Sequence, residues 1–258
     1  MRTVEIGGRS VEVDVAGRGD PVLFVHARPF ASWYAPLVAE LDDHTTIVYR
    51  RPVGDPDSFS IEGDAALVSG LLAELGIDRP HVVGHSYGGL LALELARQGE
   101  VRARSLALLE PAAMGLVEPA EAASRAAGLL ELARTAGPVP AMEAFLQAVC
   151  GPDGQGRLDE LVPGAAAEAA AHAPGFFTAE LPAVVRWSFG AEDAADLDVP
   201  ILNVVGGDSA PRFAESAAII HEWFPGAAPV AVAGATHLLV AQAPGAIARQ
   251  LREHWRDD

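Results

Sequence analysis

Short apolar runs alternate with segments of helical periodicity along the first 110 residues of the chain. The continuous apolar run at 21–25 predicts a strand that is covered on both faces, and 105–109 predicts another buried strand; strands are also predicted at 45–49 and 81–85. Apolar residues that recur every three or four positions predict helices between these strands, at 32–42, 61–76 and 87–98. Two shorter strands are predicted before them, at 4–6 and 11–15. This spacing is typical of βαβ units and predicts an α/β fold with a doubly wound, mostly parallel sheet.

The alternation stops near residue 112 and resumes near residue 198. The intervening segment has no strand-like run, and its Ala- and Glu-rich stretches predict helices at 118–135, 139–149, 157–171 and 178–190. The pattern then returns with two strands and two helices, at 200–205, 211–224, 230–232 and 244–255. We therefore expect a core formed by 1–111 and 199–258, with an all-helical cap, 112–198, inserted over the active edge of the sheet.

The composition and charge of the chain indicate which classes of binding partner and which cellular compartment to expect. The chain has 258 residues, half of them apolar, and a formal net charge of −17. This charge argues against nucleic acid and anionic membrane surfaces as partners. No apolar segment resembles a signal peptide or a membrane span, and the single Cys150 excludes an intramolecular disulfide and has no zinc-ligand spacing around it. We expect a cytoplasmic protein without a metal or cofactor, acting on a small molecule.

One motif carries chemistry. The valines of the strand at 81–85 lead into Gly84-His85-Ser86-Tyr87-Gly88-Gly89, and a helical pattern follows at once. A Gly-x-Ser-x-Gly segment between a strand and a helix is the nucleophile elbow, in which a strained turn exposes the serine hydroxyl. The amides of the new helix then face the space in front of Ser86, where they can stabilise a developing negative charge.

A serine nucleophile needs a base and a group that orients the base. His237 follows the strand at 230–232 and lies at the correct edge of the sheet. The neighbouring His85 is expected to point away from the site, because side chains alternate along a strand. Asp208 closes the segment after the strand at 200–205 and is the preferred acid; the order Ser, Asp, His favours a catalytic role for it over that of a turn or N-cap residue before Pro211. Glu110, at the end of the strand at 105–109, is the alternative.

These anchors resemble the α/β-hydrolase superfamily, in particular its capped esterases, lactonases and perhydrolases. The resemblance covers nearly the whole chain and includes His26-Ala27-Arg28-Pro29. It implies Ser86 as nucleophile, His237 as general base and then acid, and Asp208 as the residue that holds the His237 tautomer.

The resemblance also implies an oxyanion hole formed by the backbone amides of Arg28 and Tyr87, with His26 as a structural residue of the loop. Ala27 stands where the family usually has glycine, so the loop is compatible only with a negative φ at this position. The segment Arg51-Pro52-Val53-Gly54-Asp55-Pro56 lacks the Gly-x-Gly-x-Ser that often follows the preceding strand.

Substrate contacts are less specified. The Arg28 guanidinium either binds a substrate oxygen or is solvated, with only the amide used in the site. The apolar pocket under the cap is expected to include Phe30, Trp33, Phe145 and Trp187.

The expected activity is cofactor-free hydrolysis of a small, mainly apolar carboxylic ester or lactone through an acyl-enzyme at Ser86. The alternative is use of the same triad for another step, by a lyase, cyclase, C–C hydrolase or perhydrolase, because fold and triad do not fix the reaction. A non-catalytic ligand receptor is disfavoured by the intact Ser, Asp and His.

Overall fold

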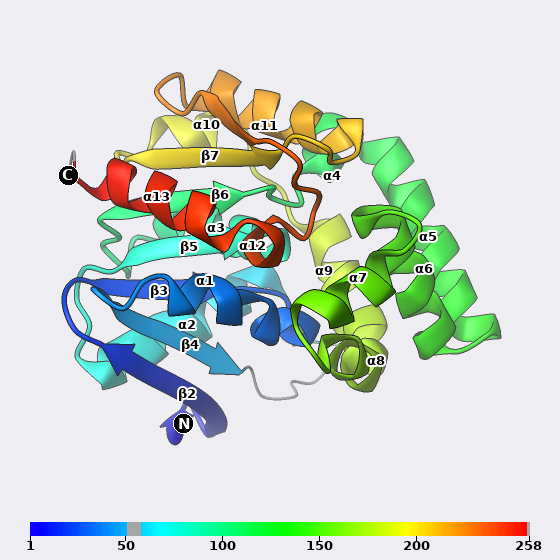
Figure 1. The fold of residues 1–258 in the computed structure, drawn as a ribbon, viewed down its shortest axis with the longest axis horizontal. Coiled ribbons are helices and arrows are strands. Elements are labelled where there is room, and N and C mark those ends of the chain that lie inside the picture. Colours follow the sequence, from blue (N-terminus) through cyan, green and yellow to red (C-terminus); the bar gives the residue numbers. More distant parts are fainter. Residues whose placement is uncertain (51–57, 257–258) are drawn as a thin grey trace.

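An eight-stranded sheet runs through the centre of the molecule (Figure 1). The computed structural model describes residues 1–50 and 58–256. The strands lie in the order β1-β2-β4-β3-β5-β6-β7-β8; β1 and β2 pair antiparallel, as do β2 and β4, and all the other pairs are parallel. Their bounds are β1 Arg2–Ile6, β2 Arg9–Gly17, β3 Pro21–Val25, β4 Thr45–Arg50, β5 His81–His85, β6 Ser105–Leu109, β7 Ile201–Gly206 and β8 Pro229–Val232.

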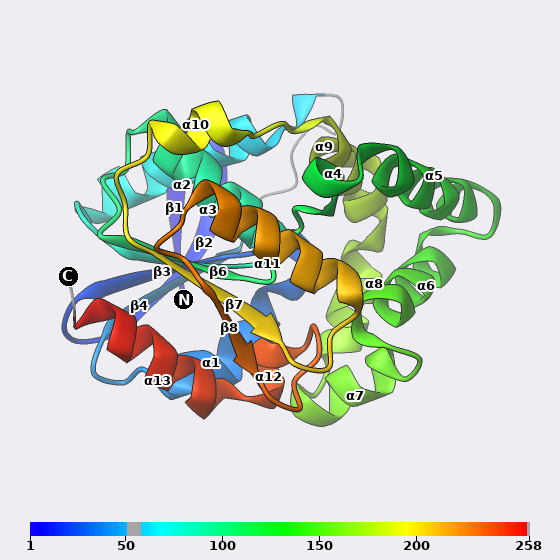
Figure 2. The ribbon, with the colours of Figure 1, turned by 90° about the horizontal axis from the view of Figure 1, so that it is seen from above.

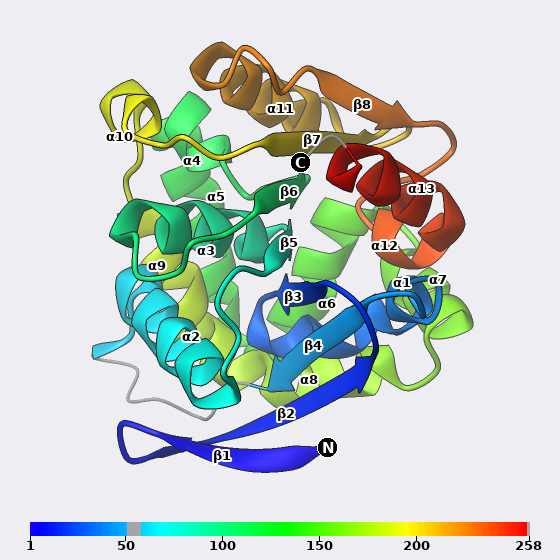
Figure 3. The same cartoon turned by 90° about the vertical axis from the view of Figure 1, so that its left-hand side faces the viewer.

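Helices cover both faces of this sheet, which confirms the doubly wound α/β architecture. Figure 3 shows α1, α12 and α13 on one face and α2 and α3 on the other. A further helix, α11, packs on β7. The bounds of these helices are α1 Ala35–Ala39, α2 Ile61–Leu75, α3 Tyr87–Gln98, α11 Pro211–Trp223, α12 Leu239–Gln242 and α13 Pro244–Trp255.

Local sequence explains where α2 begins and ends. The side chain of Ser60 accepts a hydrogen bond from the amide of Gly63 at 3.0 Å, which satisfies one of the free donors of the first turn. Gly76 follows the last turn with a φ of 70°, a left-handed conformation that glycine adopts without steric cost. The helix therefore stops where the next loop must turn back towards β5.

The chain between β6 and β7 is helical, as predicted. The bounds of its helices are α4 Met114–Val117, α5 Pro119–Thr135, α6 Pro138–Cys150, α7 Gly154–Leu161, α8 Ala165–Gly175, η3 Phe176–Glu180, α9 Leu181–Arg186 and α10 Ala191–Ala195. Figures 1 and 2 show α4 to α9 gathered beyond the carboxyl ends of the parallel strands, whereas α10 lies apart from them. The helices α4 to α9 are thus placed over the edge of the sheet where ligands bind in folds of this class. No helix in the described part of the chain is both long and apolar enough to cross a membrane.

Two predicted cap helices are divided in the structure. The helix expected at 157–171 is interrupted at 162–164, where Pro163 and Gly164 separate α7 from α8 and Gly164 has a φ of 88°. The helix expected at 178–190 begins earlier, as the π-helical turn η3, and ends at Arg186. At 162–164 proline and glycine decide the bounds, because proline lacks an amide hydrogen and glycine adopts positive φ. At 174–175 they do not, since Pro174 lies inside α8 and Gly175 has a helical φ of −66°, so the helix continues into η3.

Candidate active site

Ser86 occupies a strained turn between β5 and α3. Its φ and ψ are 56° and −118°, a conformation that residues other than glycine rarely adopt. The turn is held by backbone hydrogen bonds on both sides, since the Ser86 amide donates to Leu109 at 3.0 Å and the Ser86 carbonyl accepts from Ala112 at 3.0 Å. The Ser86 side chain makes no capping hydrogen bond to α3, so its hydroxyl is not used to start the helix. This is the geometry of a nucleophile elbow.

The glycines around Ser86 are required by close backbone approach. A Cβ on Gly84 would overlap the carbonyl of Gly88, and a Cβ on Gly88 would overlap the carbonyl of Val25 at the end of β3. Strand, helix and the loop that follows β3 therefore come together only because these positions lack side chains. This close packing brings the start of α3 against Val25 and His26.

His237 lies in the loop after β8 and is hydrogen-bonded to Glu110. The distance from Nδ1 of His237 to Oε2 of Glu110 is 2.6 Å, and both side chains are buried. The second carboxylate oxygen of Glu110 accepts from the Gly206 amide at 2.7 Å. Because an ionised carboxylate can only accept, the Nδ1–H of His237 is the donor, and Nε2 remains as the basic nitrogen.

The expected pairing of His237 with Asp208 was wrong, and the alternative acid, Glu110, has that place. Asp208 lies in an exposed turn two residues beyond the end of β7, where its amide donates to Ala235 at 2.9 Å. Glu110 directly follows β6 with a φ of 46°, which turns its side chain inwards between the ends of β6 and β7. The sequence signal was a carboxylate immediately after a fully buried strand and immediately before a proline.

His85 also lies beside His237, contrary to the expectation from strand alternation. The two ring centroids are 4.5 Å apart, and the His85 ring is 5.9 Å from that of Trp33 on its other side. Burial, and secondarily the charge of His237, lower the pKa of His85 well below its usual value. His85 is therefore a neutral ring that supports His237 near neutral pH. The sharp turn at the end of β5 breaks the simple two-residue alternation at this point.

The loop after β3 holds the two remaining residues of interest, His26 and Arg28. The His26 ring nitrogens face the carbonyl oxygens of Tyr49, at 2.8 Å, and Ala27, at 2.7 Å, so His26 ties this loop to β4. Ala27 has a φ of −65°, which satisfies the condition for an alanine in place of the usual glycine. The other departure from the family pattern, the segment Arg51-Pro52-Val53-Gly54-Asp55-Pro56, falls outside the described residues.

The expected oxyanion-hole amide of Arg28 is engaged by a carboxylate from the cap. The Arg28 amide donates to Oε2 of Glu180 at 3.0 Å, and Arg28 Nε lies 3.9 Å from Oε1 of the same residue. Glu180 is the last residue of the π-helical turn η3 and is 1% exposed. Sequence reasoning did not select Glu180, because nothing in a helical Ala/Glu-rich segment distinguishes one glutamate from another. The second expected amide, that of Tyr87, lies at the start of α3, and the Tyr87 hydroxyl donates to Asp64 at 2.9 Å.

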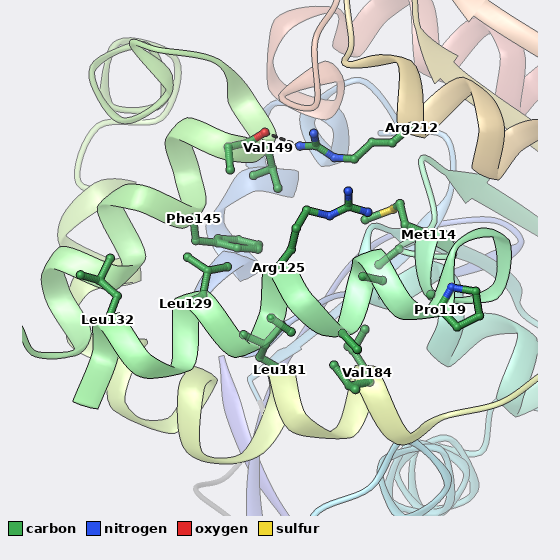
Figure 4. A pocket seen from close by; sticks show the side chains of 18 residues that line it. Met114, Pro119, Arg125, Leu129, Leu132, Phe145, Val149, Leu181, Val184 and Arg212 are labelled. Atoms are coloured by element: carbon green, nitrogen blue, oxygen red, sulfur yellow. Dashed lines mark hydrogen bonds between the residues drawn. The ribbon is translucent and has the colours of Figure 1, made fainter. Parts of the chain in front are cut away.

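The four aromatic residues expected in the pocket divide into two groups. Phe30 and Phe145 stack with centroids 6.2 Å apart, and Trp33 lies 4.6 Å from Phe30. Phe145 also lines an apolar cavity within the cap (Figure 4). Trp187 lies elsewhere: its indole donates to Glu94 of α3 at 3.0 Å and stacks on Phe189. Its packing is that of a core residue that fastens the cap to the sheet.

A second serine–histidine contact lies at the opposite ends of the strands. His81 Nδ1 is 2.8 Å from the Ser105 hydroxyl, at the first residues of β5 and β6. Ser105 is fully buried, and the His81 ring stacks on Trp255 with centroids 4.7 Å apart. A substrate cannot reach this hydroxyl, so the pair is a core contact. No cluster of three or more potential metal ligands occurs among the residues that the structure describes.

Comparison with known proteins supports the fold described above. A sequence model described as the alpha/beta hydrolase family matches residues 22–250. A thermophilic esterase from Thermogutta terrifontis superposes with a TM-score of 0.83 at 24% identity, over 100% of this chain and 99% of that one. The enol-lactonase from Burkholderia xenovorans superposes with a TM-score of 0.81 at 19% identity, over 99% and 100% of the two chains. At these identities the likeness concerns the fold alone.

A curated relative extends the comparison at the sequence level. The 2-hydroxy-6-oxo-2,4-heptadienoate hydrolase of Pseudomonas putida is 31% identical over 120 residues, which are 42% of this chain and 43% of that protein. The match thus spans less than half the length of this relative.

Proposed function

We propose that this chain, which belongs to the alpha/beta hydrolase family, is a serine hydrolase that cleaves a small, mainly apolar carboxylic ester or lactone through an acyl-enzyme at Ser86. The observation that carries the proposal is the buried hydrogen bond between His237 and Glu110 at the edge of the sheet where the strained Ser86 turn lies. A buried histidine held in one tautomer by a carboxylate is the arrangement that activates a serine hydroxyl.

In this proposal His237 Nε2 accepts the proton of the Ser86 hydroxyl as the oxygen attacks the substrate carbonyl. The protonated His237 then gives this proton to the leaving alkoxide, which departs as the alcohol. Water, deprotonated in turn by His237, attacks the acyl-enzyme and releases the acid and free Ser86. Glu110 holds the Nδ1–H of His237 throughout and stabilises the transient imidazolium.

The amides of Tyr87 and Arg28 are the proposed oxyanion donors. The Tyr87 amide belongs to the first turn of α3, where the helix leaves its amides available for an anion. The Arg28 amide donates to Glu180, so the substrate oxyanion has to replace the Glu180 carboxylate at this donor. A neutral carbonyl competes poorly with a carboxylate for an amide, whereas the tetrahedral oxyanion competes well.

The test combines active-site labelling with hydrolysis of p-nitrophenyl esters of two to eight acyl carbons and of simple lactones. A fluorophosphonate probe is expected to label the native chain and not Ser86→Ala, and ester turnover is expected to fall by about 10,000-fold or more in that variant. Labelling that persists in Ser86→Ala would refute the nucleophile assignment. Replacement of the exposed Ser124 of α5 by alanine is the matched control and should change neither result.

The second candidate is the use of the same residues for a step other than ester hydrolysis, such as C–C bond hydrolysis. The sequence similarity to the P. putida hydrolase of a 2-hydroxy-6-oxo-dienoate favours keeping this candidate. Product analysis separates the two: probe labelling of Ser86 with no turnover of any ester or lactone, but release of acid from a vinylogous 1,5-diketone, would favour C–C hydrolysis.

A further inference from the structure

The cap contains an apolar cavity of about 660 Å³, whose wall reaches Ala112 in the loop after β6. Its walls come from α4, α5, α6 and α9, and they include Met114, Leu129, Phe145, Leu181 and Val184 (Figure 4). Ala112 belongs both to this wall and to the active site, because its amide donates to the Ser86 carbonyl at 3.0 Å. A cavity of this volume accommodates a chain of several methylene groups.

Two cations, Arg125 and Arg212, lie at the wall of this otherwise apolar cavity, and Arg212 is the one without a close carboxylate among the described residues. Arg212 lies in the first turn of α11, is half-buried, and donates to the carbonyl of Ala148. No carboxylate among the described residues lies within ion-pair distance of Arg212, and burial, followed by the charge of Arg125, lowers the pKa of the Arg212 guanidinium. A guanidinium has five N–H donors, and partial burial of this charge beside another cation is unfavourable unless an anion compensates it.

Arg125 faces Arg212 from the other side of the cavity. Figure 4 shows the two side chains extending towards one another, one from α5 and one from α11. Arg125 is paired with Glu121 one turn earlier in α5, and Glu118 lies next to Glu121. The Arg125 guanidinium therefore already has a carboxylate partner, whereas Arg212 has none within ion-pair distance among the described residues, although the charge of Glu110 also acts on it. The first turn of α11 carries no acidic residue, so the helix dipole adds to this positive potential.

Arg212 is also linked to the proposed general base. Its guanidinium carbon lies 5.0 Å from the centroid of the Phe213 ring, and Phe213 stacks on His237 with centroids 4.3 Å apart. A ligand that reaches from Ser86 along the apolar wall can thus place an anionic end beside Arg212. The alternative explanation for Arg212 is structural, because Ala148 belongs to the last turn of α6 and a cation there satisfies a free carbonyl.

We propose that this cavity binds an aliphatic chain that ends in a carboxylate, with Arg212 as its anchor and Arg125 in support. The inference rests on the proposed function and specifies its substrate class: an ester or lactone whose acyl part carries a second, free carboxylate, such as a monoester of a medium-chain dicarboxylic acid. A carboxylate fits the planar donor set of a guanidinium, and the apolar walls of the cavity fit the methylene groups between the two ends.

The first experiment compares two p-nitrophenyl esters of equal length, hydrogen suberate and octanoate, which differ in one terminal carboxylate. In Arg212→Met, KM for the suberate ester is expected to rise about ten- to hundredfold, with kcat nearly unchanged and with KM for octanoate within about twofold of the native value. Arg212→Lys should retain part of the preference. Arg134→Met, which removes an exposed arginine near the end of α5, is the matched control and should leave both esters unaffected.

A merely structural role of Arg212 gives a different result. Loss of the contact with α6 would lower the melting temperature and affect both esters equally, so an unchanged suberate-to-octanoate ratio in Arg212→Met overturns the proposal. Glu121→Gln keeps Arg212 intact and frees Arg125 from its ion pair, and it should lower KM for the suberate ester alone. This second variant keeps the test valid if Arg212→Met folds poorly.

Direct binding separates failure of this inference from failure of the hydrolase proposal. Calorimetric titration of Ser86→Ala with suberate and with octanamide requires no turnover, and suberate binding that is lost in Ser86→Ala/Arg212→Met supports the carboxylate site even if no ester is cleaved. Inhibition of the native enzyme by suberate distinguishes the two sources of the carboxylate. Competitive inhibition supports the substrate assignment, whereas non-competitive inhibition or activation overturns it in favour of a free carboxylate effector.

Discussion

The carboxyl edge of the sheet and the helical cap are built on opposite principles. Every residue of β5 and β6 is buried, and the elbow, Glu110 and His237 are fixed by backbone geometry and by hydrogen bonds to neighbouring strand ends. In α5, by contrast, one residue of 17, Ala126, is buried, and the other side chains are exposed or half-buried. The residues at the carboxyl edge of the sheet are therefore tightly held, as the proposed catalytic groups require. The side chains of the cap are less constrained, and they can determine which ligand binds.

The largest effect is expected at Glu110, the carboxylate that is proposed to hold His237 at the edge of the sheet. Glu110→Gln keeps the side-chain volume but replaces the acceptor of the Nδ1–H, which allows the wrong His237 tautomer, and we expect kcat to fall by about 1,000- to 10,000-fold. Asp208→Asn changes the acid that the sequence favoured and should leave kcat within about twofold. Steady-state ester hydrolysis by both variants checks this; an equal loss in Asp208→Asn would restore Asp208 to the site.

Glycine to alanine replacements test the packing of the two regions. Gly88→Ala places a methyl group against the Val25 carbonyl and should destabilise the fold by about 3 kcal/mol or more. Gly128→Ala in α5 meets no atom within 4 Å and should stabilise the protein by about 0.5–1 kcal/mol, because alanine is the better helix former. Urea unfolding measures both, and a tolerated Gly88→Ala would show that the elbow can open.

Glu180 is the point where the cap contacts the proposed oxyanion hole. Glu180→Ala frees the Arg28 amide, and we expect kcat/KM for a neutral ester to rise about three- to tenfold. Glu143→Ala, at an exposed glutamate of α6, is the control. A loss of activity in Glu180→Ala instead of a gain would indicate that this carboxylate positions the Arg28 loop.

The smallest expected effect is on the pH dependence of the free energy of unfolding, and it arises from His81 at the start of β5. Burial, and then the charge of Arg104, lower the pKa of His81 from its usual 6.5 to about 4. The unfolded chain therefore takes up a proton before the folded one, and the free energy of unfolding falls as the pH drops from about 6.5 towards 4. His81→Gln should reduce this slope and the exposed His221→Gln should not. Urea titrations at several pH values measure the difference.

Much of the catalytic edge could be predicted because it is encoded locally. The apolar runs fixed the strands, and a Gly-x-Ser-x-Gly segment at a strand end placed Ser86 without knowledge of any distant contact. His237 followed from its position after the last strand. The cap helices could be predicted as helices, and Pro163 and Gly164 as a break between two of them. The continuation of α8 through Pro174 and Gly175 into the π-helical turn at Phe176–Glu180, where a second break was expected, depends on packing that the pattern does not contain.

The choice between Asp208 and Glu110 shows where periodicity stops being informative. Both carboxylates follow buried strands, and both lie between Ser86 and His237 in the chain, so chain order does not distinguish them. The structure selects Glu110 because a positive φ directs its side chain between two strand ends, where the Gly206 amide and His237 meet it. Beyond the last strand residue, the direction of a side chain is set by the backbone angles of the turn. The hydrophobic pattern carries no information about these angles.

The sequence by itself determined the α/β fold, the elbow at Ser86 and the position of His237 after the last strand, because each depends on local backbone preferences and on the shared direction of parallel strands. The tertiary structure alone decided which carboxylate holds His237, that Glu180 meets the Arg28 amide across 152 positions of sequence, and that Arg125 and Arg212 face one cavity. The physical reason is that contacts between distant side chains depend on the relative placement of whole elements, which no local pattern of apolar and polar residues records.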